Sequence, residues 1–248
     1  MKKLIIFPDI HGRKFWKEPF ETFKNNEDYG FIFLGDYIDA YKFENISEND
    51  AIDNFKEILD NCINHPRTTM LVGNHDIHYL PPLDEEYGCR RYDKYKKEIQ
   101  KLFLNNIDKF RVCHIEKIGD TRYVFSHAGF LKSWIEQASY GLKNLSITLD
   151  NVNDLLYSED GLFALSMYGY ERGARSRFAV GSCVWADIQE HLGIYDRFEK
   201  NIYQIFAHNQ AFPYFDDFTQ YYICEDFAML DAQKPFVLDL ENGKLSEL

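Results

Sequence analysis

The chain has 248 residues, of which 45% are hydrophobic and 17% aromatic, and its formal net charge is −12. This length allows one or two domains, and because no Pro-rich, Gly/Ser-rich or single-charge tract divides the chain, we expect one domain over residues 1–248. An acidic balance without a block of Lys and Arg argues against nonspecific nucleic-acid binding.

The first third of the chain alternates short apolar runs, typical of buried strands, with segments of helical period. The expected elements are a strand at 3–7, a helix at 14–25, a strand at 30–34, a helix at 48–64 and a strand at 68–72. Because strands and helices alternate in this βαβαβ order, we expect the strands to be parallel neighbours in one sheet.

The rest of the chain mixes the two signals. Its expected elements are a helix at 92–105, strands at 111–118 and 122–125, a strand at 202–206, and two or three strands between 219 and 240. Gly119-Asp120 predicts a hairpin turn between the first two of these strands. Residues 130–180 show no clear period, and the sequence assigns them no element.

Five of the expected strands end in polar residues that can bind metal. The endings are Asp9-Ile10-His11, Gly35-Asp36-Tyr37-Ile38-Asp39, Gly73-Asn74-His75-Asp76, Ser126-His127-Ala128-Gly129 and Ala207-His208-Asn209-Gln210. One such ending alone is explained as well by a turn or, at Asn74, by a helix N-cap. Function gathers at the carboxyl ends of strands in open α/β sheets, so five such endings indicate one shared site.

The six candidate ligands in these endings are carboxylates, imidazoles and an amide, with no thiol: Asp9, His11, Asp36, Asn74, His127 and His208. This mixture suits borderline to hard divalent ions such as Mn, Fe or Zn. Six ligands are more than one tetrahedral ion needs, so we expect two ions, with Asp36 as the candidate bridge. Two ions can clamp the attacking and leaving oxygens of a displacement at phosphorus and lower the pKa of a bound water.

His75 is the candidate general acid. It directly follows Asn74, so its side chain points elsewhere, and the leaving group is the plausible target. Asp39 is expected to orient this imidazole and to favour its protonated form.

Three arginines within six residues are candidates for binding the phosphate group of a substrate: Arg172, Arg175 and Arg177. Guanidinium forks match phosphate oxygens, and such a cluster is unusual in a chain this acidic. A solvated basic loop is the alternative explanation. Arg13 and Arg197 are weaker candidates for the same role.

The order Asp-x-His, Gly-Asp-x-x-Asp, Gly-Asn-His-Asp, His, His resembles the calcineurin-like metallophosphoesterases over positions 9 to 208. Ser126-His127-Ala128-Gly129 and Val184-Trp185-Ala186-Asp187 resemble the branch of the Ser/Thr phosphoprotein phosphatases and diadenosine tetraphosphatases. The resemblance implies a four-layer αββα sandwich of two mixed β-sheets, with a dinuclear metal site between them at strand C-terminal ends. It places one metal on Asp9, His11 and Asp36, and the other on Asp36, Asn74, His127 and His208.

The sequence departs from this branch at three places. The phosphoprotein phosphatases follow the second Asp of Gly-Asp-x-x-Asp with Arg-Gly, where this chain has Ala40-Tyr41, and they place Arg before Gly-Asn-His, where it has Val72. Both differences weigh against phosphoprotein substrates. Many family members read Gly-His-x-His at the last motif, where this chain reads Ala207-His208-Asn209-Gln210. Water or the Gln210 amide would then replace a nitrogen ligand of the first metal.

We therefore expect a metal-dependent hydrolase of phosphate esters that uses a hydroxide activated by two metals and acts on small phosphomonoesters or nucleotide polyphosphates. The alternatives are a Ser/Thr phosphoprotein phosphatase, a phosphodiesterase or nuclease, and a catalytically silent scaffold of the same fold. A silent scaffold would tend to lose ligands, whereas all six and His75 are present. Motifs of serine hydrolases, phosphate-loop enzymes and dinucleotide-binding enzymes are missing from the sequence.

The five cysteines are an odd number without a Cys-x-x-Cys pair, which supports neither a disulfide framework nor a zinc knuckle. Free thiols in a reducing compartment are the expectation. The N-terminal apolar run is too short for a secretory signal, and no window approaches the ~20 apolar residues of a membrane span. We expect a soluble, cytoplasmic protein.

Overall fold

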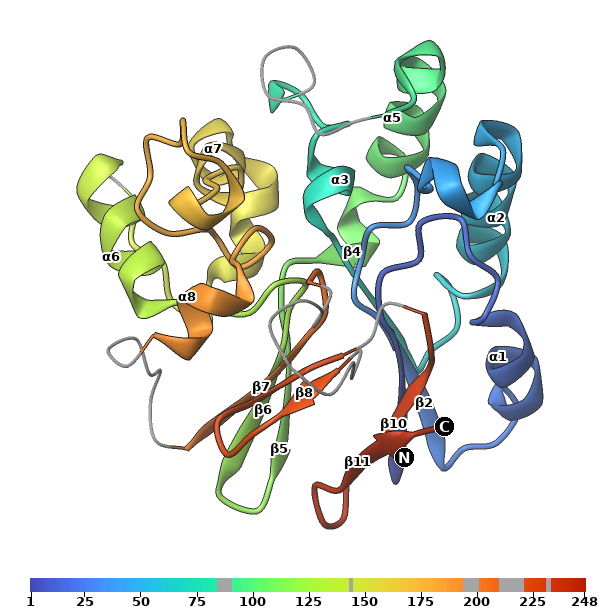
Figure 1. Cartoon of the computed structure of the whole chain (residues 1–248). Helices are drawn as coiled ribbons and strands as arrows, with labels where there is room; N and C mark the ends of the chain where they lie inside the picture. The colour runs from blue at the N-terminus through green and yellow to red at the C-terminus, as the bar shows by residue number, and fades with distance from the viewer. Residues whose placement is uncertain (84–90, 143–144, 194–200, 210–220, 231–232) are drawn as a thin grey trace.

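The computed structural model describes residues 1–83, 91–142, 145–193, 201–209, 221–230 and 233–248. Over these residues the chain forms two mixed β-sheets that pack face to face, with helices on the outer side of each sheet (Figure 1). The layers follow one another as helices, sheet, sheet and helices. This arrangement confirms the predicted fold class.

The first sheet contains β1 (Lys3–Phe7), β2 (Tyr29–Phe33), β3 (Thr68–Leu71), β4 (Phe110–Arg111), β10 (Phe236–Asp239) and β11 (Leu245–Glu247). Its order is β11-β10-β1-β2-β3-β4, in which β1 to β4 are parallel and β10 is antiparallel to β1. Helices α1 (Lys17–Phe23) and α2 (Glu48–Asn61) connect β1 to β2 and β2 to β3, as the βαβαβ order predicts.

Strand β1 shows why these runs are apolar throughout. Its residues alternate between the two faces of the sheet. Leu4 and Ile6 lie in the layer between the two sheets, where they belong to one cluster with Phe125 and Ile205 of the second sheet. Ile5 and Phe7 belong to the cluster that contains the helix residues Phe20, Phe55 and Phe103. Because both faces are covered, both sets of side chains must be apolar.

The second sheet contains β5 (His114–Ile118), β6 (Thr121–Phe125), β7 (Ile202–Phe206), β8 (Tyr222–Ile223) and β9 (Phe227–Met229). Its order is β5-β6-β7-β9-β8, with β6, β7 and β9 parallel. Strands β5 and β6 form the predicted hairpin, in which Ile118 pairs with Thr121.

The single strand expected at 111–118 is wrong. Strand β4 ends at Arg111 in the first sheet, and β5 begins at His114 in the second. Between them the backbone N–H groups of Val112 and Cys113 donate to Oδ1 of Asn153, at 2.8 and 2.9 Å. A side-chain acceptor therefore replaces the strand partner while the chain crosses between sheets.

The segment that the sequence left unassigned forms short helices. These are α6 (Lys132–Gly141), η4 (Val152–Tyr157), α7 (Glu159–Leu165) and η5 (Tyr170–Arg172), followed by α8 (Ile188–Leu192). Helices α6 and α8 lie on the outer side of the second sheet (Figure 1). Elements of three to ten residues leave too little sequence for a helical period to be visible.

The other helices of the described residues lie beside the first sheet (Figure 1). They are η1 (Lys42–Glu44), α3 (Asn74–Ile77), η2 (Asp93–Tyr95), α5 (Lys96–Leu104) and η3 (Ile107–Lys109). Across the ranges given above, none of the helices has the length and apolar character to cross a membrane.

Candidate functional site

The polar strand endings of both sheets meet at one edge of the sandwich. Strands β1, β2 and β3 lead to one set, and β6 and β7 to another: Asp9, His11, Asp36, Asp39, Asn74 and His75 from the first sheet, and His127 and His208 from the second. All are buried except His208, which is half-buried as a residue although its Nε2 atom is buried. The structure thus brings these predicted site residues together at one edge.

The backbone at these turns is strained. Four site residues adopt positive φ angles: 41° at His11, 52° at Asp36, 59° at Asp39 and 67° at His208. The left-handed conformation costs a non-glycine residue roughly 1–2 kcal/mol. Such strain persists only where the surrounding structure enforces it, and it clusters at functional sites.

Asp76 supplies part of that enforcement. Its Oδ2 accepts hydrogen bonds from the backbone N–H groups of Asp36 (2.7 Å) and Gly73 (2.8 Å), and its Oδ1 accepts from Tyr37 (3.0 Å). One buried carboxylate thus joins the turns that follow β2 and β3. Gly73 is required here, because a Cβ would lie 2.1 Å from Oδ1 of Asp36. Asp76 is part of the motif Gly73-Asn74-His75-Asp76, but the sequence offered no signal for this role.

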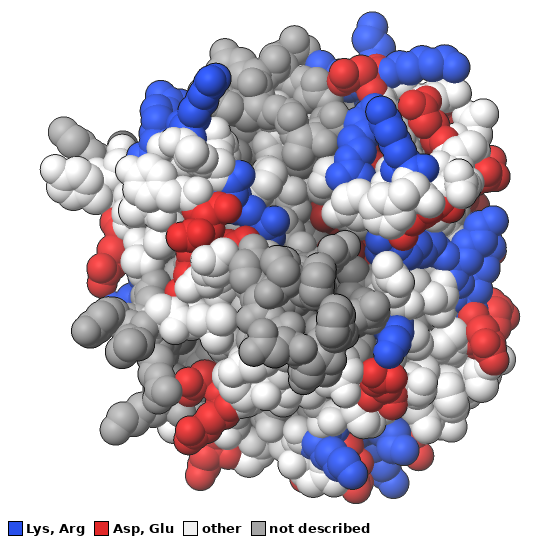
Figure 2. All heavy atoms as spheres, viewed as in Figure 1, with Lys and Arg blue, Asp and Glu red and all other residues white. Residues whose placement is uncertain are grey.

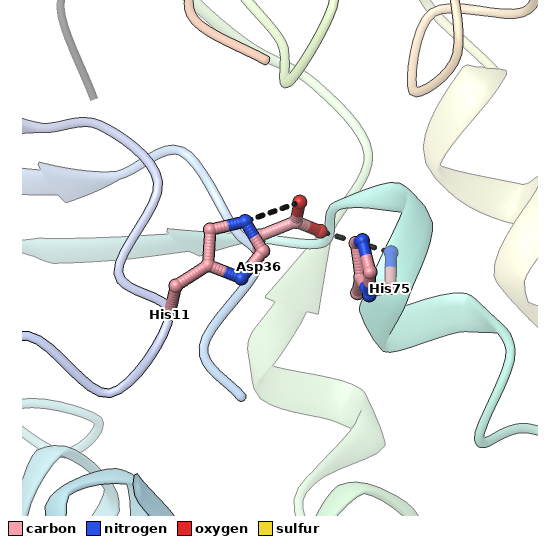
Figure 3. Close-up of side chains that lie close together, drawn as sticks. All are labelled: His11, Asp36 and His75. Carbon is pink, nitrogen blue, oxygen red and sulfur yellow. Dashed lines mark hydrogen bonds and ion pairs between the residues drawn. The ribbon is translucent and has the colours of Figure 1, made fainter. Parts of the chain in front are cut away.

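Asp36 lies between His11 and His75 (Figure 3). Its Oδ2 is 3.4 Å from Nε2 of His11, and its Oδ1 accepts a hydrogen bond from the backbone N–H of His75 at 2.9 Å. His11, Asp36 and His75 each offer one donor atom, and these atoms lie within 4.8 Å of one another. They form a first candidate metal group.

A second candidate metal group consists of Asp36, His127 and His208, with donor atoms again within 4.8 Å of one another. Nε2 of His127 lies 3.3 Å from Oδ2 of Asp36, 3.0 Å from Oδ1 of Asn74 and 3.0 Å from Nδ1 of His208. The Asn74 amide therefore faces the site. Helix α3 does begin at Asn74, but its N-cap is Gly73, which overturns the capping alternative for Asn74.

Two backbone carbonyls fix the tautomers of the imidazoles. Nδ1 of His11 lies 2.9 Å from the carbonyl oxygen of Ile38, and Nδ1 of His127 lies 2.9 Å from that of Leu34. A carbonyl only accepts, so each Nδ1 carries a proton, and in the neutral ring Nε2 has the lone pair. This is the arrangement in which an imidazole binds a metal through Nε2.

The charges of the site are strongly coupled. Burial lowers the pKa of His11 to about 3, despite the attraction of Asp36. Burial also disfavours charge on His127, but the carboxylates of Asp36 and Asp9 outweigh it and raise the pKa of His127 to about 9. Burial would raise the pKa of Asp36, yet His127 and His75 hold it well below its usual range. Without a bound cation, a proton on His127 thus balances the carboxylates.

The residues present fit divalent metal ions. The donors are oxygen and nitrogen, and Nε2 of His208 is buried with no hydrogen-bond partner among the described residues. Asp36 belongs to both groups, and it is the residue proposed from the sequence as the bridge. The first group contains His75, whereas Asp9, expected there, accepts a hydrogen bond from the backbone N–H of His208 at 3.2 Å and lies 3.7 Å from Nδ1 of His127. Gln210 and Arg197 lie outside the described residues.

A pocket of about 260 Å³ opens over these groups, lined by Asp36, Tyr41, Asn74, His75, Arg91, Arg172, Trp185 and His208. Nε of Arg172 lies 3.1 Å from Oδ2 of Asp187, and its Nη2 is buried without a hydrogen-bond partner in the described part of the chain. Basic side chains border the hollow at the centre of this face (Figure 2).

The other arginine candidates fit less well. Arg175 and Arg177 are exposed and do not line this pocket, so of these three arginines Arg172 is the candidate for binding phosphate. Arg13 forms an ion pair with Glu44 at 2.6 Å. The sequence reasoning missed Arg91, which follows no recognisable motif.

The chain matches the sequence model of one family, described as calcineurin-like phosphoesterase, over residues 2–217. No curated protein matches the sequence. A cold-active protein tyrosine phosphatase is 16% identical, with a TM-score of 0.58, over 100% of this chain and 79% of its own. A second structure of such an enzyme, from a psychrophilic Shewanella species, gives the same identity and TM-score over 100% of this chain and 80% of its own.

A proposed diadenosine tetraphosphatase is 12% identical, with a TM-score of 0.47, over 100% of this chain and 93% of its own. At these identities the likeness to the two tyrosine phosphatase structures shows the fold alone, and the likeness to the third is weaker still.

Proposed function

Because the chain belongs to the calcineurin-like phosphoesterase family, and so is a hydrolase of phosphoric esters, we propose that it cleaves small phosphomonoesters or nucleotide polyphosphates at a site for two divalent metal ions. The observation that carries the proposal is the convergence of two donor groups on one shared carboxylate, Asp36. A shared carboxylate is what two neighbouring cations require.

Asp9, His11 and Asp36 would hold one ion, and Asp36, Asn74, His127 and His208 the other. The donor set suits Mn, Fe or Zn. When bound, such a pair lowers the pKa of a water and stabilises charge that develops on phosphate oxygens. The chain's part is to hold these donors: the carbonyls of Ile38 and Leu34 orient two of the imidazoles, and Asp76 fixes the turns around Asp36.

We assign His75 the role of general acid. Its Nδ1 faces Oδ2 of Asp39, so a carboxylate favours the imidazolium form. The side of the ring away from Asp39 is then directed toward the pocket that His75 lines. From there His75 gives its proton to the oxygen that departs from phosphorus. Arg172 would bind the phosphoryl oxygens through its guanidinium.

Small substrates are favoured over phosphoproteins. Ala40-Tyr41 and Val72 stand where the phosphoprotein phosphatases have arginine, so this chain lacks those contacts. We also place the protein in the cytoplasm, because its four described cysteines are free thiols, as expected in a reducing compartment.

The test is a screen of the Mn-loaded protein against nucleotides, dinucleoside polyphosphates, sugar phosphates and phosphopeptides. The variant Asp36→Asn, loaded in the same way, is the control for contaminating phosphatases. We expect release of phosphate from the small substrates by the wild type only. Faster turnover of phosphopeptides would favour the Ser/Thr phosphatase alternative, cleavage of phosphodiesters would favour the nuclease alternative, and no turnover at all would favour a silent scaffold.

A further inference from the structure

Arg91 is a second guanidinium of the pocket, and the mechanism above does not use it. It precedes η2 and is exposed, so it stands at the mouth of the pocket rather than at its floor. Two contacts hold it there. Its Nη1 donates a hydrogen bond to the backbone carbonyl of Asp39 at 2.6 Å, and its Cζ lies 4.2 Å from the centre of the Tyr41 ring.

The residue beside it is anchored to the same loop. Tyr92 is 5% exposed, and its hydroxyl accepts a hydrogen bond from the backbone N–H of Ala40 at 2.9 Å. Arg91 and Tyr92 thus contact three consecutive residues: Arg91 contacts Asp39 and Tyr41, and Tyr92 contacts Ala40. A side chain held at both its base and its head loses less conformational entropy when it binds a ligand.

The charge of Arg91 has no ion-pair partner in the described part of the chain. Among the described residues no carboxylate forms an ion pair with it, in contrast to Arg13 with Glu44 and to Arg172 with Asp187. A guanidinium has five N–H groups, and the Asp39 carbonyl takes one of them. In a protein of net charge −12, a held guanidinium that meets no described carboxylate and lies beside a pocket is suited to an anionic ligand.

Its position indicates which part of the ligand it meets. Arg91 bonds the backbone of Asp39, the residue whose carboxylate holds His75, so it lies on the side of the proposed general acid. Arg172 is held by Asp187, whose carboxylate also accepts a hydrogen bond from Asn209, the neighbour of His208. The two guanidiniums therefore belong to two sides of the pocket.

We propose that Arg91 binds a second phosphate group, carried by the leaving group, so that the pocket favours phosphoanhydrides such as nucleoside diphosphates over simple monoesters. This inference rests on the proposed function. In the reaction a water oxygen forms a bond to the terminal phosphorus and the bridging P–O bond breaks. The electron pair stays on the bridging oxygen, which takes the proton from His75, and the departing phosphate remains on Arg91 until release.

The experiment compares two kinds of substrate in the metal-loaded protein. The leaving group of adenosine diphosphate is adenosine monophosphate, which carries a phosphate, whereas the leaving group of ribose 5-phosphate is the uncharged sugar ribose. Arg91→Ala is expected to lower kcat/KM about 10-fold on the diphosphate, the low end for a lost charge-assisted hydrogen bond because the group is exposed, and less than about twofold on the sugar phosphate. Lys132→Ala, which removes an exposed cation on α6, is the control and should change neither.

Binding gives a second readout. In the wild type, inorganic pyrophosphate should inhibit more strongly than inorganic phosphate. This preference for pyrophosphate should become smaller as the salt concentration rises, and Arg91→Ala should remove it. Arg91→Lys keeps the charge without the fork and should retain part of it, which keeps the test valid if the alanine variant is unstable.

Equal losses on both substrates would mean that Arg91 acts through Asp39 and His75 or on the reacting phosphate, and no loss would mean that it binds nothing; either result overturns this inference alone. A wild type that hydrolyses neither substrate would instead overturn the proposed function.

Discussion

The imidazole of His75 lies 2.9 Å, Nδ1 to Oδ2, from the fully buried carboxylate of Asp39. The other oxygen of Asp39 accepts a hydrogen bond from the Tyr79 hydroxyl at 2.6 Å. Because both oxygens are engaged, the carboxylate cannot rotate away, and the ring of His75 is held in one orientation. His75 also contributes to the first candidate metal group, so its role as acid and a role as ligand have to be distinguished by experiment.

The leaving group provides that distinction. An alkoxide is basic and leaves poorly without a proton, whereas a nitrophenolate can leave as an anion. General acid catalysis is typically worth ~10²–10⁴-fold. His75→Asn should therefore lower kcat/KM by about that factor on an alkyl or ribosyl phosphate and much less on an aryl phosphate, with metal content unchanged. The measurement is kcat/KM across a series of leaving groups, with elemental analysis of each protein.

Asp39→Asn should show the same dependence on the leaving group more weakly, since it removes only the partner that orients and charges the imidazole. A uniform loss on all substrates, or loss of metal, in His75→Asn would show that His75 is a ligand and that the proton comes from another group.

Metal content tests the shared carboxylate. We expect about two divalent ions per chain after careful reloading. Asp36→Asn keeps an acceptor for the backbone N–H of His75 but removes the charge common to both groups, so both ions should bind more weakly. Asp9→Asn should weaken mainly one. Elemental analysis that finds a single ion in the wild type would contradict a dinuclear site.

Proton release reports on His127. Its pKa of about 9 means that it is protonated at pH 7.5, whereas a metal needs its Nε2 lone pair. Metal binding at pH 7.5 should release about one proton from His127, and this release should fall as the pH rises through 9. Titration calorimetry in buffers of different ionisation enthalpy measures it. His11, with a pKa of about 3, contributes none.

The same charge pair affects folding without metal. The pKa of His127 is raised in the folded state, so its attraction to Asp36 and Asp9 stabilises the metal-free protein fully below pH 6.5 and is lost as the pH rises through about 9. In the metal titration, a release of protons that grows with pH would come from some other group and would contradict the assignment of the released proton to His127.

Arg172 and Arg175 form a matched pair within one loop. Arg172 lines the pocket and Arg175 is exposed outside it. Arg172→Ala should raise KM or lower kcat with metal content unchanged, because a lost charge-assisted bond costs roughly 1.5–3 kcal/mol. Arg175→Ala should leave the kinetics as they are. The prediction is wrong if the two variants behave alike in steady-state assays.

The sequence was most informative where an apolar strand gave way abruptly to polar residues. Asp9, Asp36 and Asn74 could be placed in one site because parallel strands end at one edge, and this required no knowledge of side-chain contacts. Asp76 could not be given a role, since its partners are backbone N–H groups, two of them in the turn after β2. Arg91 could not be placed, because its position depends on a stacking contact with Tyr41 far along the chain.

The unassigned and misassigned segments have a similar cause. Val112 and Cys113 continue an apolar run, and only the side chain of Asn153 shows that the strand is interrupted there. The periodicity of apolar residues indicates regular helices and strands, but it does not show where tertiary contacts end such an element.

The left-handed turns at His11, Asp36, Asp39 and His208 limit how far this protein can be made heat-resistant. A common engineering route relieves left-handed strain by placing glycine, which adopts positive φ without steric cost. Here each of the four strained positions carries a proposed ligand or the partner of His75, so the relief would remove the side chain that the strain serves. Thermostable yet active variants will have to draw their gains from other parts of the fold, such as the helix ends and the exposed surface.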